Sequence, residues 1–467
     1  MTRFFLINFL FWFLSVSLGG LLAQTDSSFE DQFFDDIEID SDDESFKSSV
    51  ELSKAEEDSV SRTFDISGSV SQGAIVGLGD PSDHFQREAK GVESVKTEIF
   101  LLSQGKHSEN MKSKISAVVE YEWGGWENGS YSFEASQKAL EVRDLFLDIS
   151  HESGVWIRVG NQIIARSQLD SLKITDVVNP LDLSTPGLVD LKDLRIHVPA
   201  ILLSTPLKSA NLELVVIYDG GGNKNAPSGS SFDFANSILN QQGLYSETID
   251  DEPQNKFEAV GRLNYRLNGG DLSLTIADVN WDSLTPRLLE IHGEVATIKQ
   301  GYDRVKVLGL SGNLVRSDYL FKYEIALHDG RVFQRDLYTA LPWSPHKQIV
   351  SGVGIEYNGI SDIVLSGEIS NTYMLDHNDS LFNSEFETGY ILQARWTGLN
   401  DIVSVNGAYS KLTGDDSSIY TLFFEYDLTD NLKFDSQIAL YDASSQNDFL
   451  FPFKKHDAIK GSLKYSF

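Results

Sequence analysis

Polar residues suited to a binding or positioning site gather in one stretch near the middle of the chain. Asp176, Asn179, Pro180 and Asp182 lie close together, and Arg195 follows. Proline fixes its own φ and keeps the preceding residue extended, while aspartate carboxylates accept backbone N–H bonds and hold turns. The sequence therefore predicts a pinned loop. Its polar side chains either stabilise that loop or contact a ligand directly.

Hydrolytic chemistry has one local candidate, the run from His151 to Gly154. A nucleophile, its base and an orienting group must approach a substrate from different positions, which adjacent residues in a short turn do not provide. The chain has no Gly-x-Ser-x-Gly elbow, no His-Glu-x-x-His motif and no phosphate-binding glycine loop. The lack of cysteine excludes thiolate metal sites. We predict no catalytic residue, no metal site, no cofactor and no enzymatic activity.

The elements around these residues have the alternating pattern of β-strands. Apolar residues or glycine recur at every second position over 257–267, 421–428 and 432–440, except at Ser436. Such runs extend for roughly ten to fourteen residues, against about 9–11 for a tilted strand that crosses a bilayer and about five or six in soluble sheets. In a membrane barrel the apolar face meets lipid and the polar face meets a wet lumen. The strand lengths therefore favour a transmembrane barrel.

Connections between these strands alternate between short and long, as in barrels with short periplasmic turns and long external loops. Tight turns are predicted at His151–Gly154, Lys208–Ala210, Asn268–Gly270, Arg316–Asp318, Gly359–Ser361, Gly398–Asp401 and Thr429–Asn431. Longer connections are predicted at Asp80–Gly91, Gly125–Lys138, Arg166–Arg195, Gly220–Asn255, Asp282–Tyr302, Gly330–His346, Leu375–Glu385 and Ala443–Lys455, with Arg287 to Ile298 counted as loop. The predicted fold is all-β: a transmembrane antiparallel up-and-down β-barrel of about 18 strands, with about 16 as the alternative.

The chain ends on a strand of strict alternation. Ile459, Gly461, Leu463, Tyr465 and Phe467 share one face. A final strand that ends in phenylalanine, with tyrosine two residues earlier, resembles the terminal strand of bacterial outer-membrane barrels. This resemblance implies that Tyr465 and Phe467 form an assembly signal for the barrel assembly machinery, and that the strand closes the barrel against the first. The last strand of a soluble sandwich is the alternative.

Charged side chains on the polar faces would line the lumen of such a barrel. The arginines predicted to face inward are Arg143, Arg158, Arg262 and Arg266. Acidic partners for them are available on neighbouring strands, among them Glu120, Glu122, Glu141 and Glu258. Inward charges in a large barrel belong to a solvated wall. These arginines are therefore either general wall residues or contributors to solute selectivity.

The composition restricts the partners. The 467 residues carry a formal net charge of −31, whereas binding to nucleic-acid phosphates needs clustered lysine and arginine. We predict no nucleic-acid partner. Beyond the first 30 residues, no stretch approaches the roughly 20 apolar residues of a spanning helix. A barrel meets no such requirement, because only every second strand residue faces lipid.

Residues 1–23 have the pattern of a secretory signal peptide. Arg3 gives a positive start, Phe4 to Leu14 form the apolar core, and small residues follow. Cleavage is predicted between Ala23 and Gln24. Retention of this segment as a membrane anchor is the alternative.

Residues 24–62 are crowded with aspartate and glutamate. A segment that repels itself and has few apolar residues does not fold alone. We predict a disordered periplasmic segment here, followed by the barrel at 63–467. The alternative is a segment that docks on a partner through a small apolar set: Phe29, Phe33, Phe34, Ile37 and Ile39.

The region from Leu140 to Leu203 resembles a proteobacterial outer-membrane barrel family catalogued as domain of unknown function 1302. The resemblance rests on an arginine-containing strand around Arg143, a Gly-x-Gln strand ending at Gln162, an Asp-Val-x-Asn-Pro-x-Asp loop from Asp176 to Asp182, and an Arg-x-x-x-Pro-Ala strand from Arg195 to Ala200. The chain departs from this family at Ala165 to Ser167, where members usually carry a Trp-Gly pair. The resemblance implies trafficking of hydrophobic or amphiphilic compounds alongside a periplasmic or inner-membrane exporter.

The sequence thus predicts a protein of the cell outer membrane, surrounded by its lipid, that lets a small-molecule solute pass. A barrel of this size encloses more space than side chains fill. The alternative is a non-conducting surface or scaffold barrel with binding loops, such as Gly220–Asn255.

Overall fold

The computed structural model describes residues 63–79, 90–127, 130–189, 194–227, 230–233, 245–334, 343–378, 381, 384–413, 416–445, 448, 450–454 and 456–467. The predicted signal peptide, its cleavage site at Ala23 and Gln24, and the acidic segment lie outside these residues. No helix in the described part of the chain is long and apolar enough to cross a membrane.

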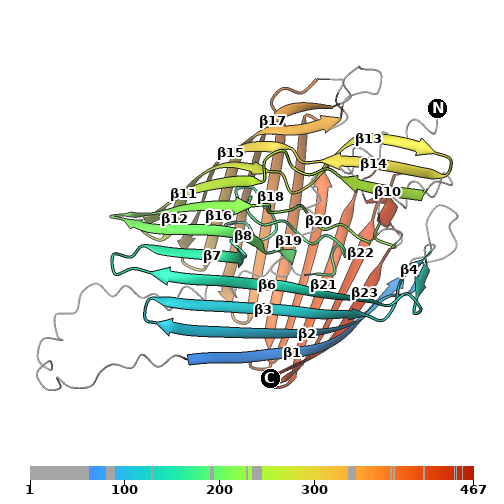
Figure 1. Cartoon of the computed structure of the whole chain (residues 1–467), viewed down its shortest axis with the longest axis horizontal. Coiled ribbons are helices and arrows are strands. Elements are labelled where there is room, and N and C mark those ends of the chain that lie inside the picture. Colours follow the sequence, from blue (N-terminus) through green and yellow to red (C-terminus); the bar gives the residue numbers. More distant parts are fainter. Residues whose placement is uncertain are drawn as a thin grey trace, which may run out of the picture.

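The described chain folds into a closed antiparallel β-barrel of 18 strands (Figure 1). Five short strands belong to two smaller sheets. Each of the other 18 strands pairs with the barrel strands that come before and after it in the sequence. The barrel strands are β1 (Thr63–Leu78), β2 (Lys90–Ser108), β3 (Met111–Glu122), β6 (Gln137–Ser150), β7 (Trp156–Gln162), β8 (Val198–Leu207), β9 (Ala210–Tyr218), β11 (Phe257–Leu267), β12 (Gly270–Asn280), β15 (Arg304–Arg316), β16 (Tyr319–Gln334), β17 (Trp343–Ile360), β18 (Ile363–Met374), β19 (Phe386–Gly398), β20 (Val403–Thr413), β21 (Ser418–Thr429), β22 (Leu432–Asp442) and β23 (Ala458–Ser466). The predicted up-and-down fold and its higher strand number are confirmed.

Two small sheets stand apart from the barrel wall. One pairs β10 (Tyr245–Asp250) with β14 (Val295–Gly301) and β13 (Thr285–His292), and the other is the hairpin of β4 (Gly125–Glu127) and β5 (Ser130–Ser132). Residues 287–298, which the sequence analysis counts as loop, are therefore largely strand. These strands are shorter than the about 9–11 residues that cross a bilayer, so they leave the barrel count unchanged.

Pairing of the last strand with the first closes the barrel. Tyr465 lies opposite Val70, and the register continues to Ala458 opposite Gly77. Gly68 and Phe467 exchange both backbone hydrogen bonds, each 2.9 Å long. The closure predicted from the terminal strand is confirmed, because no edge is left on either strand over this register. The assembly role of Tyr465 and Phe467 stays a prediction.

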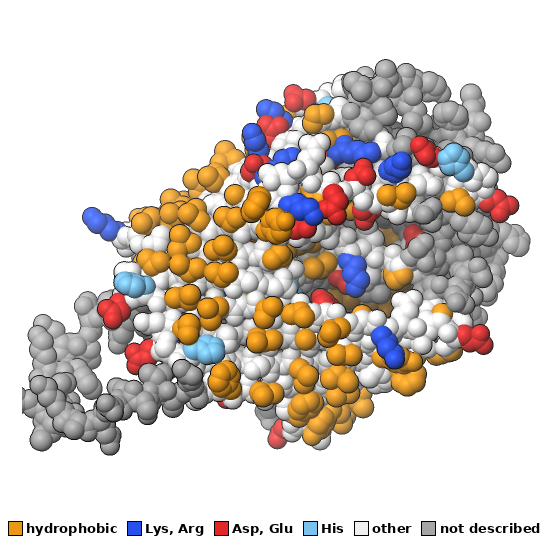
Figure 2. All heavy atoms as spheres, in the orientation of Figure 1, with side chains coloured by type: hydrophobic (Ala, Val, Ile, Leu, Met, Phe, Trp, Pro, Cys, Tyr) orange, Lys and Arg blue, Asp and Glu red, His pale blue; other side chains and the backbone are white. Residues whose placement is uncertain are grey.

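The apolar faces of the strands point outward. On β11, Phe257, Leu263 and Tyr265 are exposed on the outside, whereas Glu258 and Arg262 on the other face are buried. Figure 2 shows the same arrangement as a broad field of hydrophobic side chains over the outer wall. Soluble proteins rarely expose apolar patches of this extent, whereas a transmembrane barrel carries an apolar outer band. The alternating pattern therefore has its oily side toward lipid.

The two ends of the barrel differ. At one end, here called the turn end, strands are joined by tight turns such as Ser317–Asp318 and Ser361–Asp362. Ser317 and Asp362 have φ of 51° and 62°, the left-handed conformation that closes a short hairpin. The longer connections gather at the other end, here called the loop end, and one of them turns back into the barrel.

Candidate functional site

The connection from β7 to β8 fills part of the lumen. The chain leaves the wall after Gln162, and strand pairing resumes at Val198. We call residues 163–197 the inner segment; residues 190–193 lie outside the described part. Its buried apolar side chains pack on inward-facing apolar residues of the wall, and the cluster comprises Ile164, Leu169, Ile174, Val177, Val178, Val198, Ala200, Leu202, Val215, Ile217, Val260, Val279, Val305, Val307 and Ala326. A dry core therefore holds the segment against β8, β9, β11, β12, β15 and β16.

One carboxylate on the wall organises the first turn of the inner segment. Glu324 of β16 is buried and accepts five hydrogen bonds. Its Oε1 accepts from Ser167 Oγ at 2.9 Å, Gln168 N at 2.5 Å and Leu169 N at 3.2 Å. Its Oε2 accepts from the backbone N and the Oγ1 of Thr175, both at 2.9 Å. Two carboxylate oxygens offer about four lone-pair sites, so the acceptor capacity of Glu324 is fully used.

A second buried carboxylate on β18 acts in the same way. Glu368 accepts from Asp170 N at 2.7 Å and from Ser171 N at 3.1 Å. The Asp170 side chain in turn pairs with Lys322 of β16 at 2.5 Å, and Lys322 also reaches Glu356 at 3.3 Å. The backbone N–H groups of this turn thus find acceptors on the wall, which offsets the cost of burying them.

Asn179 ties the two ends of the inner segment together. Its Oδ1 accepts from Ile164 N at 2.7 Å, while its Nδ2 donates to Ile196 O at 2.8 Å and to Gln162 O at 3.2 Å. Ile196 N also donates to Pro180 O at 2.8 Å. An amide side chain is needed here because the site requires both a donor and an acceptor.

The predicted loop acids both have cationic partners. Asp176 Oδ2 accepts from Arg195 Nη2 at 3.0 Å, and both side chains are buried. Asp182 pairs instead with Lys224 at 2.7 Å, and its backbone N donates to Leu194 O at 2.7 Å. These contacts favour the stabilising role that the sequence analysis proposes for the motif over direct contact with a ligand.

Nearby positive charges favour the ionised form of Asp176 and of Asp182. Burial by itself would raise the pKa of Asp176, but the charges of Arg195 and Lys173 lower it below its ordinary value of 3.8. Burial acts in the same direction on Asp182, and the ammonium group of Lys224 lowers the pKa of that carboxyl below its ordinary value.

Between neutral pH and strong acid, Asp176 is expected to hold the inner segment down to pH 3.8 and to release it only below that value, where the conductance of the narrowed channel should rise. Because the folded pKa of Asp176 is lowered, its pairing stabilises the segment above pH 3.8 and is lost as the pH falls through the lowered value. Single-channel recording across this range measures the effect. Asp176→Asn should be more conducting than the parent at neutral pH and should lose the step below pH 3.8. Equal conductance of the parent and the variant at neutral pH, with the same step in strong acid, would contradict the assignment.

The inner segment reaches the opposite wall. The hydroxyl of Tyr441 on β22 donates to Pro186 O, and Lys460 Nζ on β23 lies 3.4 Å from Leu188 O. Gly187 has φ of 72°, and a Cβ there would lie 3.2 Å from the Cβ of Ala439. Glycine therefore suits both the backbone conformation and the close approach. The segment spans the lumen from the β8–β18 wall to β22 and β23.

The four predicted lumen arginines take different positions. Arg262 is buried and donates to Arg166 O at 2.8 Å, so it anchors the inner segment. Arg158 forms two hydrogen bonds with Asp148, at 2.7 and 3.0 Å. Arg143 pairs with Glu141 at 3.7 Å, with both side chains open to solvent. Arg266 is exposed near the turn end.

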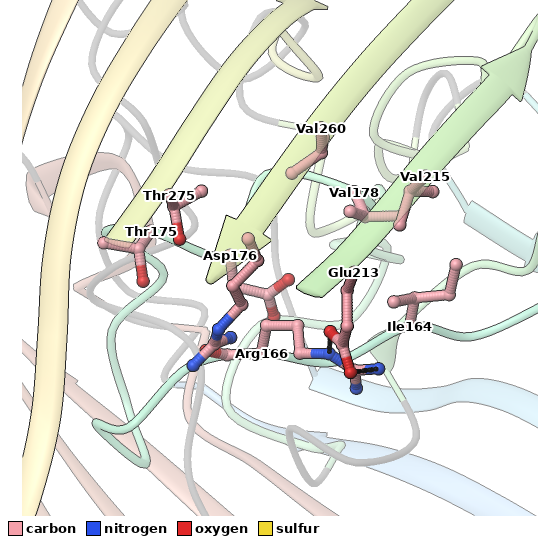
Figure 3. Close-up of a pocket in the computed structure, with 10 residues that line it drawn as sticks. Ile164, Arg166, Thr175, Asp176, Val178, Glu213, Val215, Val260 and Thr275 are labelled. Carbon is pink, nitrogen blue, oxygen red and sulfur yellow. Dashed lines mark hydrogen bonds and ion pairs between the residues drawn. The ribbon is translucent and has the colours of Figure 1, made fainter. Parts of the chain in front are cut away.

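A small cavity remains behind the inner segment (Figure 3). It is lined by Arg166, Asp176, Glu213, Arg262 and Thr275 among others, and it has room for about one water molecule. Asp176 Oδ1 and Thr275 Oγ1 are buried without a hydrogen-bond partner. A single water there would satisfy polar atoms, but the cavity is too small for a solute.

The open part of the lumen lies on the other side of the segment. On β2 and β3, Lys96 pairs with Glu98 at 3.3 Å and with Glu120 at 3.6 Å, and these side chains are far more exposed than Glu324 or Glu368. Charges on the covered wall hold the inner segment. On β6, Asp144 also contacts the segment through His197 at 3.5 Å, whereas Lys96, Glu98 and Glu120 on β2 and β3 are partly exposed.

The sequence analysis did not single out Glu324, Glu368 or Lys322. Each lies on a strand whose alternation looks like that of any other strand, and each meets its partner more than a hundred residues away in the chain. A carboxylate on a predicted inward face is the only local sign of this role, and many barrel strands have one.

Comparison with known proteins shows similarity in fold alone. No family model matches this chain, and no curated protein matches it in sequence. Among solved structures, Acinetobacter baumannii OccAB3 has a TM-score of 0.50 at 8% identity and covers 86% of this chain and 99% of its own. A. baumannii OccAB1 and Pseudomonas aeruginosa OpdK with vanillate both have a TM-score of 0.50 at 8% identity and cover 86% of this chain. The match covers 96% of the OccAB1 chain and 98% of the OpdK chain. The chain therefore has the fold of closed transmembrane β-barrels.

Proposed function

We propose that this protein is an outer-membrane channel for passive passage of a solute. The observation that carries the proposal is a closed barrel with lipid-facing apolar residues outside and, inside, a buried segment beside an open charged wall. A structural plug alone would have no need for solvated Lys, Arg and Glu side chains on β2, β3 and β6, whereas a water-filled path does.

The inner segment sets the width of the proposed channel. It is held by Glu324 and Glu368 on one wall and contacts Tyr441 on the other, so in this proposal the solute passes beside the charged residues of β2 and β3. OpdK, which shares the fold, was crystallised with vanillate. For the present chain we propose a small solute with polar or ionic groups that match the charges of that wall.

The resemblance of residues 140–203 to the family of domain of unknown function 1302 supports a more specific proposal. In this proposal the solute is hydrophobic or amphiphilic, and a periplasmic or inner-membrane exporter delivers it. The acidic segment at 24–62 would then lie on the periplasmic side, where an exporter partner is found.

A non-conducting scaffold barrel is the second candidate. Its support is the extra sheet of β10, β13 and β14 at the loop end, which provides a surface apart from the barrel wall. Binding without passage would then be the function of the loops.

Purified protein in a planar lipid bilayer is expected to give discrete, stepwise conductance. In this proposal ions pass along the partly exposed charges of β2 and β3, so no added ligand is needed. A correctly folded barrel, judged by its heat-dependent gel mobility, that stays electrically silent would refute the channel and favour the scaffold.

A further inference from the structure

The barrel wall has an unpaired edge between β6 and β7. β6 pairs with β3 from Ile149 to Gln137, with a register shift at Arg143 and Asp144. On its other edge, β6 pairs with β7 only from Ser150 to Leu145. Within the residues that the structure describes, no strand pairs with the second edge of residues 137–144. At about 3.3 Å per residue, this free edge is on the order of 25 Å long.

Neighbouring hairpins do not have this overhang. β8 and β9 remain paired up to Ala200 opposite Ile217, and β11 and β12 up to Ala259 opposite Asp278, close to their loop-end limits. β7 is short because the chain turns inward after Gln162 to form the inner segment. Figure 1 shows β6 continuing past the end of β7. The inward turn of the chain after Gln162 therefore forms the inner segment and also leaves the edge of β6 without a partner strand.

The free part of β6 is solvent-accessible on both faces. Leu140 is 71% exposed and Val142 47% on the outer face. The side chains of Glu141 and Arg143, on the inner face, are 46% and 38% exposed. Figure 2 shows the surface hollowed at this part of the wall, with basic and acidic side chains inside the hollow.

Backbone chemistry requires this gap to be wet or to hold polar groups. Unpaired N–H and C=O groups that face hydrocarbon cost several kcal/mol each, and at membrane depth they are tolerated only where they are buried in protein or line a water-filled cavity. Asn161 Nδ2 donates to the carbonyl oxygens of Val142, at 3.2 Å, and Arg143, at 2.5 Å. The backbone N–H and C=O groups of the free edge between Gln137 and Glu141 have to be satisfied by water or by polar groups of a ligand.

We propose that this gap is a lateral portal through which single-chain amphiphiles with an ionic head group exchange between the lumen and the surrounding bilayer. The proposal deepens the channel function and rests on it. Leu140 and Val142 offer an apolar rim to the chain of the amphiphile, while the Glu141–Arg143 pair inside offers both charges to its head group.

Site-specific fluorescence quenching tests the portal directly. The chain has no cysteine, so each introduced cysteine is unique. Glu141→Cys places a bimane label at the portal, Asp435→Cys places it in the lumen on β22, whose two edges are both paired, and Leu263→Cys places it on the lipid face. The proteins are reconstituted in phosphatidylcholine vesicles that contain brominated lysophosphatidylcholine, and iodide serves as the aqueous quencher in separate samples.

The portal predicts that iodide quenches the labels at 141 and 435, whereas the brominated lysolipid quenches at 141 and 263 several-fold more than at 435. Lysolipid quenching at 263 alone would overturn the portal. Equal lysolipid quenching at 141 and 435 would also overturn it, because the lipid would then enter through the mouth of the barrel. Slow hydrogen exchange of all amides over 137–144 would mean that another strand occupies the edge, a further contrary result. Bilayer conductance is measured independently. A conducting barrel whose label at 141 is not quenched by the lysolipid would refute the portal alone. A silent barrel whose label at 141 is quenched by the lysolipid would refute the channel.

Discussion

Replacing residues 166–195 by a short glycine–serine linker should raise the single-channel conductance several-fold while the barrel stays closed. The inner segment spans the lumen between Glu324 on one wall and Tyr441 on the other, so its removal widens the path at its narrowest level. The strand ladder does not depend on the segment, because the pairings of β7 with β6 and β8 lie outside the deleted residues. Recordings from the parent and the variant in the same salt give the ratio.

The matched control shortens a connection that does not enter the lumen. The β4–β5 hairpin lies at the loop end, and its removal should leave the conductance near that of the parent. Deletion of the inner segment also bares apolar side chains of its core to water, so a lower thermal stability is expected alongside the wider pore. A folded variant with unchanged conductance would show that residues 166–195 do not constrict the channel.

Glu324→Ala should undock the inner segment without opening the barrel. The substitution removes the acceptor of three backbone N–H groups and two hydroxyls, and it leaves those donors buried. Each buried donor that is left without an acceptor costs about 1–3 kcal/mol. The docked conformation of the inner segment is then destabilised. Trypsin should cut the variant at Arg166 and Lys173, and it should leave both sites intact in the parent.

Two further variants sharpen this test. Glu324→Gln keeps one acceptor oxygen but turns an NH₂ group toward either Thr175 or Gln168, so it should also undock the segment, with a smaller effect than alanine. Glu356→Gln changes a carboxylate on the next strand that contacts Lys322 and no backbone of the segment, and it should leave the segment protected. Equal trypsin resistance in the parent and in Glu324→Ala would refute the anchoring role.

Much of the fold follows from local chemistry. Alternation over stretches such as 257–267 and 432–440 identifies the strands, because each residue pair meets one apolar and one polar environment. Glycine and aspartate positions locate the turns, and the run from Leu463 to Phe467 indicates the closing strand. The strands at 285–292 and 295–301 were not predicted, because they are too short to span a bilayer and lie within a long connection that was counted as loop.

The candidate site is less accessible from sequence. Asp176, Asn179 and Arg195 are recognisable as loop-forming residues, since their hydrogen bonds run within about twenty positions of the chain. Their anchors on the wall, Glu324 and Glu368, depend on which strands face each other across the lumen. The free edge of β6 depends on where β7 stops, which a single Gly-Asn-Gln run does not reveal. Long-range closure, rather than local propensity, fixes these features.

The orientation of the strand faces underlies every proposal above, and the mobility of the protein on a gel tests it most directly. Detergent-solubilised protein, run without heating, should migrate faster than the boiled sample, because a closed barrel whose oily side chains are covered by detergent resists unfolding and stays compact. Material that is soluble and monomeric without detergent, and that migrates identically before and after boiling, would place the apolar faces inside a soluble β protein and contradict the account.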